Sequence, residues 1–287
     1  MEAFIGAFVF IFGLACGSFL NVCITRLPAD RSVIAPRSAC PECGHAIRWY
    51  DNVPLLSWLW LRARCRDCRA PIALRYPIVE LATPALFLAC YLHFVDSRMA
   101  AKFALFTFLN VGLAFTDLEA RLLPDEFTLG GLAAGLALSL ATWVSGWVPS
   151  ATGHVRLYSL GNAAFGALIG AGLLFLIGEA YRLTRGREGM GLGDVKLAAM
   201  MGSFLGAKLT LLSVFLAATA SAVIGVLLIT VIAQGRWRRY RNRKRAIQSV
   251  RVALHTIPLP FGTFLAAAAI FCGFFGTQLL DWYFSLG

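Results

Sequence analysis

Apolar stretches separated by short polar segments dominate this chain from one end to the other. A helix needs roughly 20 apolar residues to cross about 30 Å of hydrocarbon, and eight segments reach or approach that length. The predicted spans are 3–24, 77–95, 103–116, 127–148, 158–178, 195–207, 209–233 and 257–280. We therefore predict an all-α polytopic membrane protein with about eight transmembrane helices. The third and sixth spans are short, which suggests helices that end early beside a polar site.

The composition supports a membrane location. Of the 287 residues, 59% are hydrophobic and only 14% are charged, more apolar surface than one soluble core of this length requires. The first apolar stretch opens Met1-Glu2-Ala3, without the basic start of a secretory signal, and runs too long for one. We interpret it as a retained span.

The net charge of +11 is distributed unevenly along the chain. Residues 26–75 hold nine Arg against four acids, and residues 235–256 hold seven Arg and one Lys without an acid. Basic residues gather in cytoplasmic loops of membrane proteins, so this pattern places the loops after spans 1, 3, 5 and 7 in the cytoplasm and both termini outside. The run 236–245 mixes aromatic and basic residues, but contact with anionic lipid explains it better than nucleic-acid binding.

The cysteines fall into two groups. Four lie singly in apolar spans, where a thiol behaves as a small hydrophobic group: Cys16, Cys23, Cys90 and Cys272. The other four form two CxxC pairs 21 residues apart, Cys40 with Cys43 and Cys65 with Cys68. Two such pairs can complete a closed tetrahedral site, so we predict a structural zinc ion. Disulfides are the alternative, and a reducing cytoplasm disfavours them. Trp49, Tyr50, Trp58 and Trp60 either pack on this small fold or rest at the lipid headgroups.

Two aspartates adjoin the short spans. Asp117 ends the apolar run 103–116, and Asp194 follows Gly191 and Gly193 in a GxGD sequence. A carboxylate at membrane depth is costly, so each requires an explanation. Taken alone, Asp194 is an ordinary helix N-cap. The predicted topology changes that interpretation, because it brings both carboxylates to the same cytoplasmic edge.

Two carboxylates in contact share one proton, which is the state that aspartic peptidases use. The ionised member takes a proton from water as the water attacks a carbonyl, and the protonated member donates to the carbonyl oxygen. The glycines before Asp194 are expected to give the backbone access to positive φ and to let a substrate strand approach closely. We therefore predict hydrolysis of a peptide bond by Asp117 and Asp194.

At this point the chain resembles the type IV prepilin leader peptidases, a family of GxGD intramembrane aspartyl peptidases. Six ordered motifs carry the resemblance over nearly the whole chain. They are Gly17–Val22 with Arg26–Pro28, the paired CxxC motifs, Arg75–Glu80, Asp117–Asp125, Gly191–Lys196 and Pro260–Gly262.

The resemblance implies a multi-pass enzyme of the bacterial inner membrane that removes the basic leader of prepilins and pseudopilins for type IV pilus or type II secretion assembly. It also implies N-methylation of the new N-terminus with S-adenosylmethionine. No motif here identifies a binding site for that donor. The expected domains are a first helix (1–25), a zinc-binding domain linked to methyl transfer (26–76) and a membrane peptidase domain (77–287) with a basic loop at 235–256.

Two positions depart from the family pattern. Ala63 replaces a usual glycine two residues before the third cysteine, and Thr263 stands where the last-span motif usually has proline. Neither departure is expected to touch the aspartates, and the first makes methyl transfer less secure. Acidic residues that are hypothetical contacts for a basic leader are Glu80, Glu119, Asp125 and Glu126. The last two also suit the first turn of the fourth span, where acids favour the helix dipole.

Two other classes of function remain possible from the sequence. A transporter or channel would use intramembrane carboxylates to carry ions or protons. It requires polar residues spread through the membrane interior, and the only charged residue expected well inside a span lies near Glu179. A non-catalytic assembly protein would use the zinc loop to dock a cytoplasmic partner. The sequence does not fix the oligomeric state, although Gly and Ala crowd spans 4, 5 and 8, which suggests close helix packing.

Overall fold

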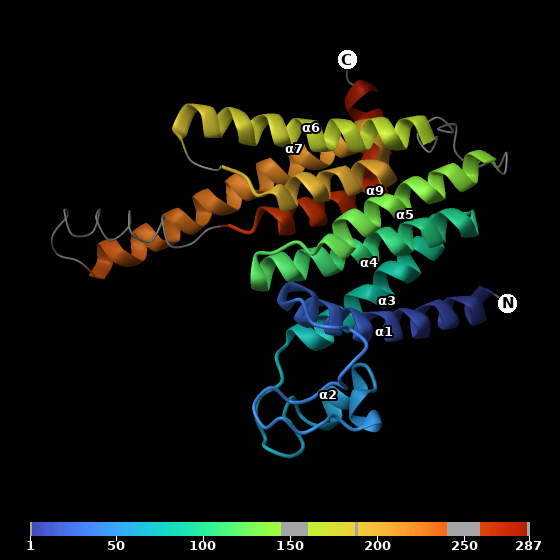
Figure 1. The fold of residues 1–287 in the computed structure, drawn as a ribbon, viewed down its shortest axis with the longest axis vertical. Coiled ribbons are helices and arrows are strands. Elements are labelled where there is room, and N and C mark those ends of the chain that lie inside the picture. The colour runs from blue at the N-terminus through green and yellow to red at the C-terminus, as the bar shows by residue number, and fades with distance from the viewer. Residues whose placement is uncertain (1, 145–159, 187–188, 240–258, 286–287) are drawn as a thin grey trace.

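The computed structural model describes residues 2–144, 160–186, 189–239 and 259–285 (Figure 1). Within these ranges there is no β-strand, only isolated bridges between Ala39 and Ala46 and between Arg64 and Pro71. The all-α prediction is confirmed. The long helices are α1 (Glu2–Arg26), α3 (Arg75–His93), α4 (Ser97–Ala120), α5 (Asp125–Val144), α6 (Leu160–Arg185), α7 (Leu192–Arg239) and α9 (Phe261–Ser285).

Five helical segments of the described chain are long and apolar enough to cross a membrane. They are Glu2–Ala29, Ser97–Ala120, Leu160–Arg185, Leu192–Gln234 and Phe261–Ser285. α3 and α5 occupy the predicted second and fourth spans but are not among these five. The structure thus supports a membrane protein with several spans, and the number eight stays a prediction.

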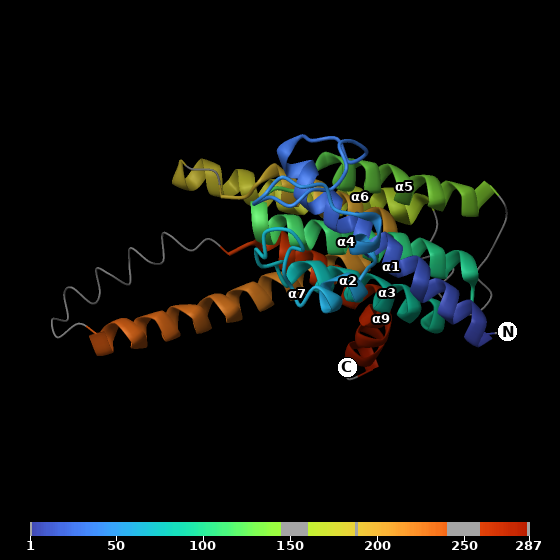
Figure 2. The same ribbon diagram turned by 90° about the horizontal axis from the view of Figure 1, so that it is seen from below.

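α7 contains the predicted sixth and seventh spans, joined at Gly206. The backbone there has φ 74° and ψ 176°, which is not helical and suits glycine. Gly225, well beyond the break, lies against Leu259, two residues before α9 begins, with a Cβ built on it 3.0 Å from Leu259 Cδ1. After the break at Gly206, α7 therefore runs back toward the side of the bundle where it starts. This second part of α7 extends past the other helices in both views (Figures 1 and 2).

The expected short third span is wrong, because α4 runs over 24 residues from Ser97 to Ala120. Asp96 extends it at the start, since its side chain accepts hydrogen bonds from the backbone N–H groups of Arg98 and Met99. At the other end Arg121 adopts a left-handed conformation, and its N–H bonds to the Asp117 carbonyl. Asp117 therefore lies inside the last turn of the helix rather than after it.

Glycines let the helices approach closely within this one chain. A Cβ on Gly13 of α1 would lie 2.5 Å from Pro84 Cα in α3, and one on Gly202 of α7 would lie 2.2 Å from the Gly166 carbonyl of α6. Such small residues replace side-chain packing with backbone contact, as in many membrane helix pairs.

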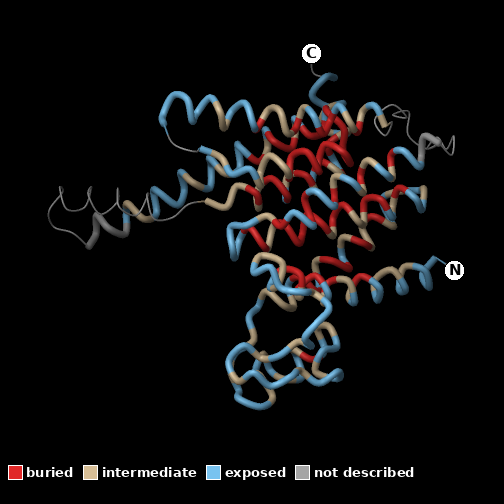
Figure 3. The backbone as a smooth tube through the Cα atoms, viewed as in Figure 1, coloured by how far each residue is buried: buried red, intermediate tan, exposed pale blue. Residues whose placement is uncertain are grey.

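Buried side chains concentrate among α4, α5, α7 and α9 (Figure 3). The largest fully buried ones include Phe103, Phe106, Phe204 and Leu265. The segment between α1 and α3 forms a separate small module below the helices (Figure 1), and it contains a short helix, α2 (Leu56–Trp60). The basic loop 235–256 lies outside the described residues from 240 onward.

Candidate functional site

Asp117 is buried at the end of α4, with 6% of its surface exposed. The start of α9 packs directly against it, and a Cβ on Gly262 would lie 3.0 Å from Asp117 Oδ2. A side chain at position 262 would therefore crowd the carboxylate. The close approach gives a physical reason for the glycine in the Phe261-Gly262 motif.

Thr263 donates two hydrogen bonds to Asp117. Its backbone N–H lies 2.7 Å from Asp117 Oδ2, and its hydroxyl Oγ1 lies 3.1 Å from the same oxygen. The same Oγ1 is 3.0 Å from the carbonyl oxygen of Ala114. The expectation that the departure at Thr263 does not touch the aspartates is therefore wrong. The change in the motif was visible in the sequence, but its contact with α4 depends on how α9 packs.

Asp194 is partly buried in the first turn of α7, which begins at Leu192. It is therefore not the N-cap residue. Its own N–H bonds to the Gly191 carbonyl at 3.1 Å. The expectation of positive φ at the preceding glycines is wrong, since among the described glycines only Gly44, Gly186 and Gly206 adopt it.

The two glycines before Asp194 have different surroundings. Gly193 is confined, because a Cβ there would lie 3.2 Å from Leu123 Cβ and Cδ1. Gly191 is exposed, and apart from the Gly193 amide nothing lies near its Cβ position. The open backbone at Gly191 fits the expected close approach of a substrate.

The structure brings the two aspartates together at one edge of the helices. Asp117 lies in the last turn of α4, and Asp194 lies in the first turn of α7. Leu123 contacts both Gly193, which precedes Asp194, and Gly262, which packs against Asp117. The two aspartates therefore lie on either side of this leucine. The edge thus contains two carboxylates from distant parts of the sequence.

Ion pairs surround this edge. Lys196 of α7 lies 2.6 Å from Asp125 of α5, and Arg75 at the start of α3 pairs with Glu119 of α4. Asp125 and Glu126 both fall in the first turn of α5, as expected. Of the four hypothetical leader contacts, Glu119 and Asp125 are thus engaged in ion pairs, and Glu126 is exposed.

The fourth hypothetical contact, Glu80, has a structural role. It is 8% exposed within α3, and its Oε2 accepts the backbone N–H of Leu55 at 2.9 Å. Leu55 has a φ of 61°, an uncommon value that this bond helps to hold. Separately, Asn21 of α1 donates to the Tyr76 carbonyl of α3 at 3.1 Å and so joins those two helices. Glu80 therefore fixes the small module to the membrane helices and is not placed to receive a leader.

The four cysteines of the small module converge on one point. The sulfur atoms of Cys40, Cys43, Cys65 and Cys68 all lie within 4.8 Å of one another, and those of Cys40 and Cys68 are 3.8 Å apart. Four thiolates about 2.3 Å from a tetrahedral zinc ion lie about 3.8 Å from each other. The cluster can therefore hold a metal ion.

The two CxxC pairs have the same local geometry. The amide of Cys40 bonds to the His45 carbonyl at 3.0 Å, and the amide of Cys65 bonds to the Ala70 carbonyl at 2.8 Å. Gly44 and Arg69, each the residue after the second cysteine of a pair, both have positive φ. This repeated turn aims each pair of thiols at the common centre.

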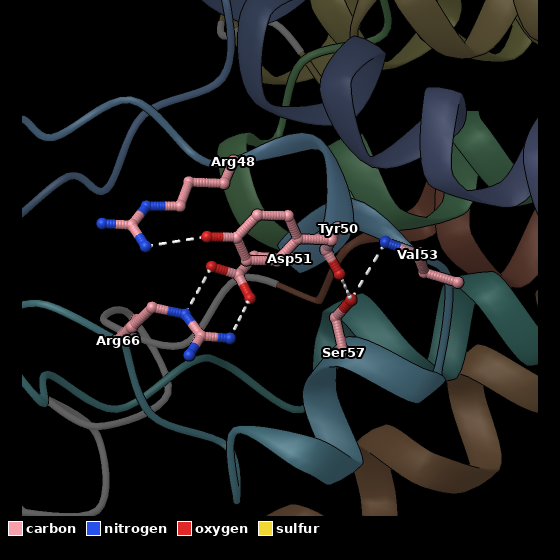
Figure 4. Close-up of polar contacts among 6 residues, drawn as sticks. All are labelled: Arg48, Tyr50, Asp51, Val53, Ser57 and Arg66. Carbon is pink, nitrogen blue, oxygen red and sulfur yellow. Dashed lines mark hydrogen bonds and ion pairs between the residues drawn. The ribbon is translucent and has the colours of Figure 1, made fainter.

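A polar cluster supports the module beside the cysteines (Figure 4). Arg66 binds both carboxylate oxygens of Asp51, at 2.8 and 2.6 Å, and thereby lowers the pKa of that carboxyl. Ser57 donates to the Tyr50 carbonyl and accepts from the Val53 N–H. Trp58 packs into the fold, whereas Trp49 and Trp60 are 76% and 82% exposed. The placement of the last two at the lipid headgroups stays a prediction.

Lys102 is a buried charged residue that the sequence interpretation missed. It lies in α4 with 4% of its surface exposed, and its Nζ is 3.2 Å from Ser139 Oγ of α5. The predicted third span began one residue later, so Lys102 was assigned to a loop. Other buried hydroxyls bond to carbonyls of the preceding helical turn, including those of Thr107, Thr116, Ser203, Thr210 and Ser213. Each of these hydroxyls therefore has a carbonyl partner within its own helix.

The fold and site define a helical membrane protein with two interacting carboxylates at one edge and a four-cysteine module beside α1 and α3. Residues 11–94 match the bacterial peptidase A24 N-terminal domain, and residues 103–226 match the type IV leader peptidase family. The chain belongs to the type IV leader peptidase family.

Several relatives are named prepilin leader peptidase/N-methyltransferase. The protein of Aeromonas hydrophila is 36% identical over 299 residues, covering 96% of this chain and 92% of its own length. That of Myxococcus xanthus is 42% identical over 237 residues, which are 80% of this chain and 64% of the relative. That of Pseudomonas aeruginosa is 33% identical, covering 95% and 91%. No solved structure matches the chain.

Proposed function

We propose that this protein removes the basic leader peptide of type IV prepilins and type II secretion pseudopilins with Asp117 and Asp194, and then N-methylates the new N-terminus. The observation that carries the peptidase assignment is the position of Leu123, which lies against Gly193, beside Asp194, and against Gly262, which packs on Asp117. The two aspartates, 77 positions apart, therefore share one edge of the helices. Membership of the family and the names of the relatives support the same activity.

The hydrolytic step uses the carboxylate pair with one shared proton. The ionised member removes a proton from water, and the oxygen of that water bonds to the carbonyl carbon of the scissile peptide. The protonated member gives its proton to the carbonyl oxygen, so the pair again holds one proton. When the tetrahedral intermediate collapses, the C–N bond breaks and the leaving nitrogen takes a proton from the pair. The hydroxyl proton of the intermediate returns to the other carboxylate.

The position of the pair suits a prepilin substrate. A basic leader followed by an apolar helix places its cleavage site where the membrane meets the cytoplasm. Basic residues of this chain also lie at the edge of the aspartates, including Arg26, Arg75 and Lys196. We infer that this edge faces the cytoplasm, that the protein resides in the bacterial inner membrane, and that eight spans alternate across it.

Methyl transfer would depend on the small module. The four cysteines fit zinc, whose closed coordination would fold a segment too small to form its own core. S-adenosylmethionine would supply the methyl group, and its binding residues stay unassigned. Ala63 at the usual glycine position has a φ of 56°, so the backbone keeps a conformation that glycine favours.

Substitution of either aspartate tests the peptidase assignment. With purified protein in detergent and a prepilin peptide, Asp117→Asn and Asp194→Asn should each lower the rate of leader loss by at least about a hundredfold. Mass spectrometry detects the loss of the leader, and methyl gain is scored separately with and without S-adenosylmethionine.

Asp281→Asn is the control, because Asp281 lies near the far end of α9. Zinc content and membrane insertion should be unchanged in all three variants. Normal cleavage by one aspartate variant would remove that residue from the mechanism. The alternative of an ion or proton transporter receives no support from the relatives, and an Asp117-dependent flux into liposomes would revive it.

A further inference from the structure

We propose that Thr263 is a positioning residue that keeps the negative charge of the aspartate pair on Asp117. Asp117 then acts as the base toward water, and Asp194 carries the proton and acts as the acid. This inference rests on the proposed aspartate pair and adds a fixed division of labour to it.

The first support is the unusual position of the Thr263 amide. Thr263 is the third residue of α9, and the first amides of a helix have no carbonyl partner within it. Pro260, directly before the helix, has no side-chain oxygen to accept them. The carboxylate of Asp117 takes that role from another helix, with the Thr263 amide 2.7 Å from Oδ2. An acceptor at a helix N-terminus is stabilised most when it is negatively charged.

The second support is the hydroxyl of the same residue. Thr263 Oγ1 lies 3.1 Å from Asp117 Oδ2 and 3.0 Å from the Ala114 carbonyl oxygen, but it has one proton to donate. When Asp117 is ionised, the hydroxyl can turn to Oδ2 and add a second hydrogen bond to the charge. If Oδ2 were protonated, the hydroxyl would turn to Ala114, and the amide would face a weaker acceptor. Both donors therefore favour the ionised form.

Both donors reach the same oxygen of Asp117, so the other oxygen, Oδ1, is left to accept a proton from water. Asp194 has a different setting, with its side chain in the first turn of α7 and no hydrogen bond from α9 among the described residues. Of the other charged groups of this edge, Lys196 pairs with Asp125 and Arg75 with Glu119. Arg26 donates to the Ser32 and Pro36 carbonyls, and Arg121 and Glu126 are exposed. Thr263 is thus the group that distinguishes one aspartate from the other.

Three substitutions at position 263 separate its two donors. Thr263→Val removes the hydroxyl and keeps the amide, Thr263→Ser keeps both, and Thr263→Pro removes both while suiting the first turn of a helix. Leader cleavage is measured from pH 4 to 9, giving kcat and KM at each pH. Because the resemblance places proline here in other family members, we expect altered pH dependence and not complete loss.

The acid limb of the kcat profile should move to higher pH in Thr263→Val and further in Thr263→Pro, by about one pH unit for the latter. This corresponds to about a tenfold lower kcat on that limb. The sign follows because an Asp117 with fewer donors takes up a proton at higher pH and loses its ability to act as a base. KM should stay unchanged, and Thr263→Ser should retain the parent profile. Thr277→Val, on the same helix and far from the site, is the matched control.

Coincident profiles for the valine variant and the parent would overturn the proposal. So would an equal loss of kcat at every pH, because that result indicates a purely structural role. If Thr263→Pro does not fold, the comparison of valine with serine still decides the question. Full activity of Asp117→Asn would instead refute the aspartate pair itself, so the two failures are distinguishable.

Discussion

At the aspartate edge, glycines without a Cβ atom allow α4, α7 and α9 to approach closely. Gly262 is close to Asp117 Oδ2, and Gly193 is close to Leu123, so a side chain at either position would crowd its neighbour. These glycines are selected by close approach, since neither adopts positive φ. In the small module the situation is reversed: Ala63 carries a Cβ but adopts a positive φ, a conformation in which a Cβ is costly.

Replacing Ala63 with glycine should therefore stabilise the module. A left-handed conformation costs a residue with a Cβ about 1–2 kcal/mol, which glycine avoids. The greater freedom of glycine in the unfolded chain lowers stability by about 0.4–1 kcal/mol and offsets part of this gain. The expected net gain is roughly 0.5–1 kcal/mol, measured as resistance to unfolding in denaturant by tryptophan fluorescence. The backbone bonds of Ala63, to the Trp58 carbonyl and from the Ile72 amide, should persist.

Ala46→Gly is the matched control for this prediction. Ala46 forms an extended bridge with Ala39 and has no positive φ, so glycine there should lower stability. If Ala63→Gly destabilises the module as Ala46→Gly does, backbone strain at position 63 is not significant.

At the scale of elements, the cysteine module and the aspartate edge are built on different helices. The module is tied to α3 through the bond of Glu80 to Leu55, whereas Asp117, Asp194 and Thr263 belong to α4, α7 and α9. Between these parts, Leu20 of α1 packs against the Gly112 position of α4, and Arg75 of α3 pairs with Glu119 of α4. Among the described residues the hydrogen bonds of the four cysteines stay within the module, so we expect the two activities to be separable.

Cys40→Ser should remove most of the bound zinc, which is expected at about one ion per chain in the parent. Methylation should fall with the zinc, and leader cleavage should fall by less than about threefold, because within the described ranges the aspartate edge makes no bond to the cysteines. Metal analysis, methyl incorporation and leader loss are measured on one preparation. Cys16→Ser, a free thiol in α1, controls for the loss of a cysteine. Equal loss of both activities would mean that the module supports the entire fold.

The whole molecule shows which features could be predicted from sequence. Apolar runs located the helices, and the two CxxC pairs located the metal cluster, because both signals are local. The ends of α4 were missed, since Asp96 caps the helix and Lys102 is buried in it against Ser139, a contact from another helix. The contact between Thr263 and Asp117 joins positions 146 residues apart, and no local pattern encodes it. Glu80 likewise looked available for a substrate until its bond to Leu55 placed it between two parts of the chain.

The orientation of the protein in the membrane is a prediction about the entire molecule. The C-terminal ends of α1, α4 and α6 and the N-terminal ends of α3, α5, α7 and α9 lie toward one side of the bundle (Figure 1). Basic residues at these ends favour the cytoplasm. In intact cells a membrane-impermeant maleimide should therefore label Ser97→Cys, at the start of α4, but label Thr184→Cys, near the end of α6, only after permeabilisation. Both positions are exposed, so accessibility of the side chain does not bias the comparison. The parent chain reports the background from its own cysteines, and the reverse labelling pattern would place the aspartates on the side of the membrane that prepilin leaders do not reach.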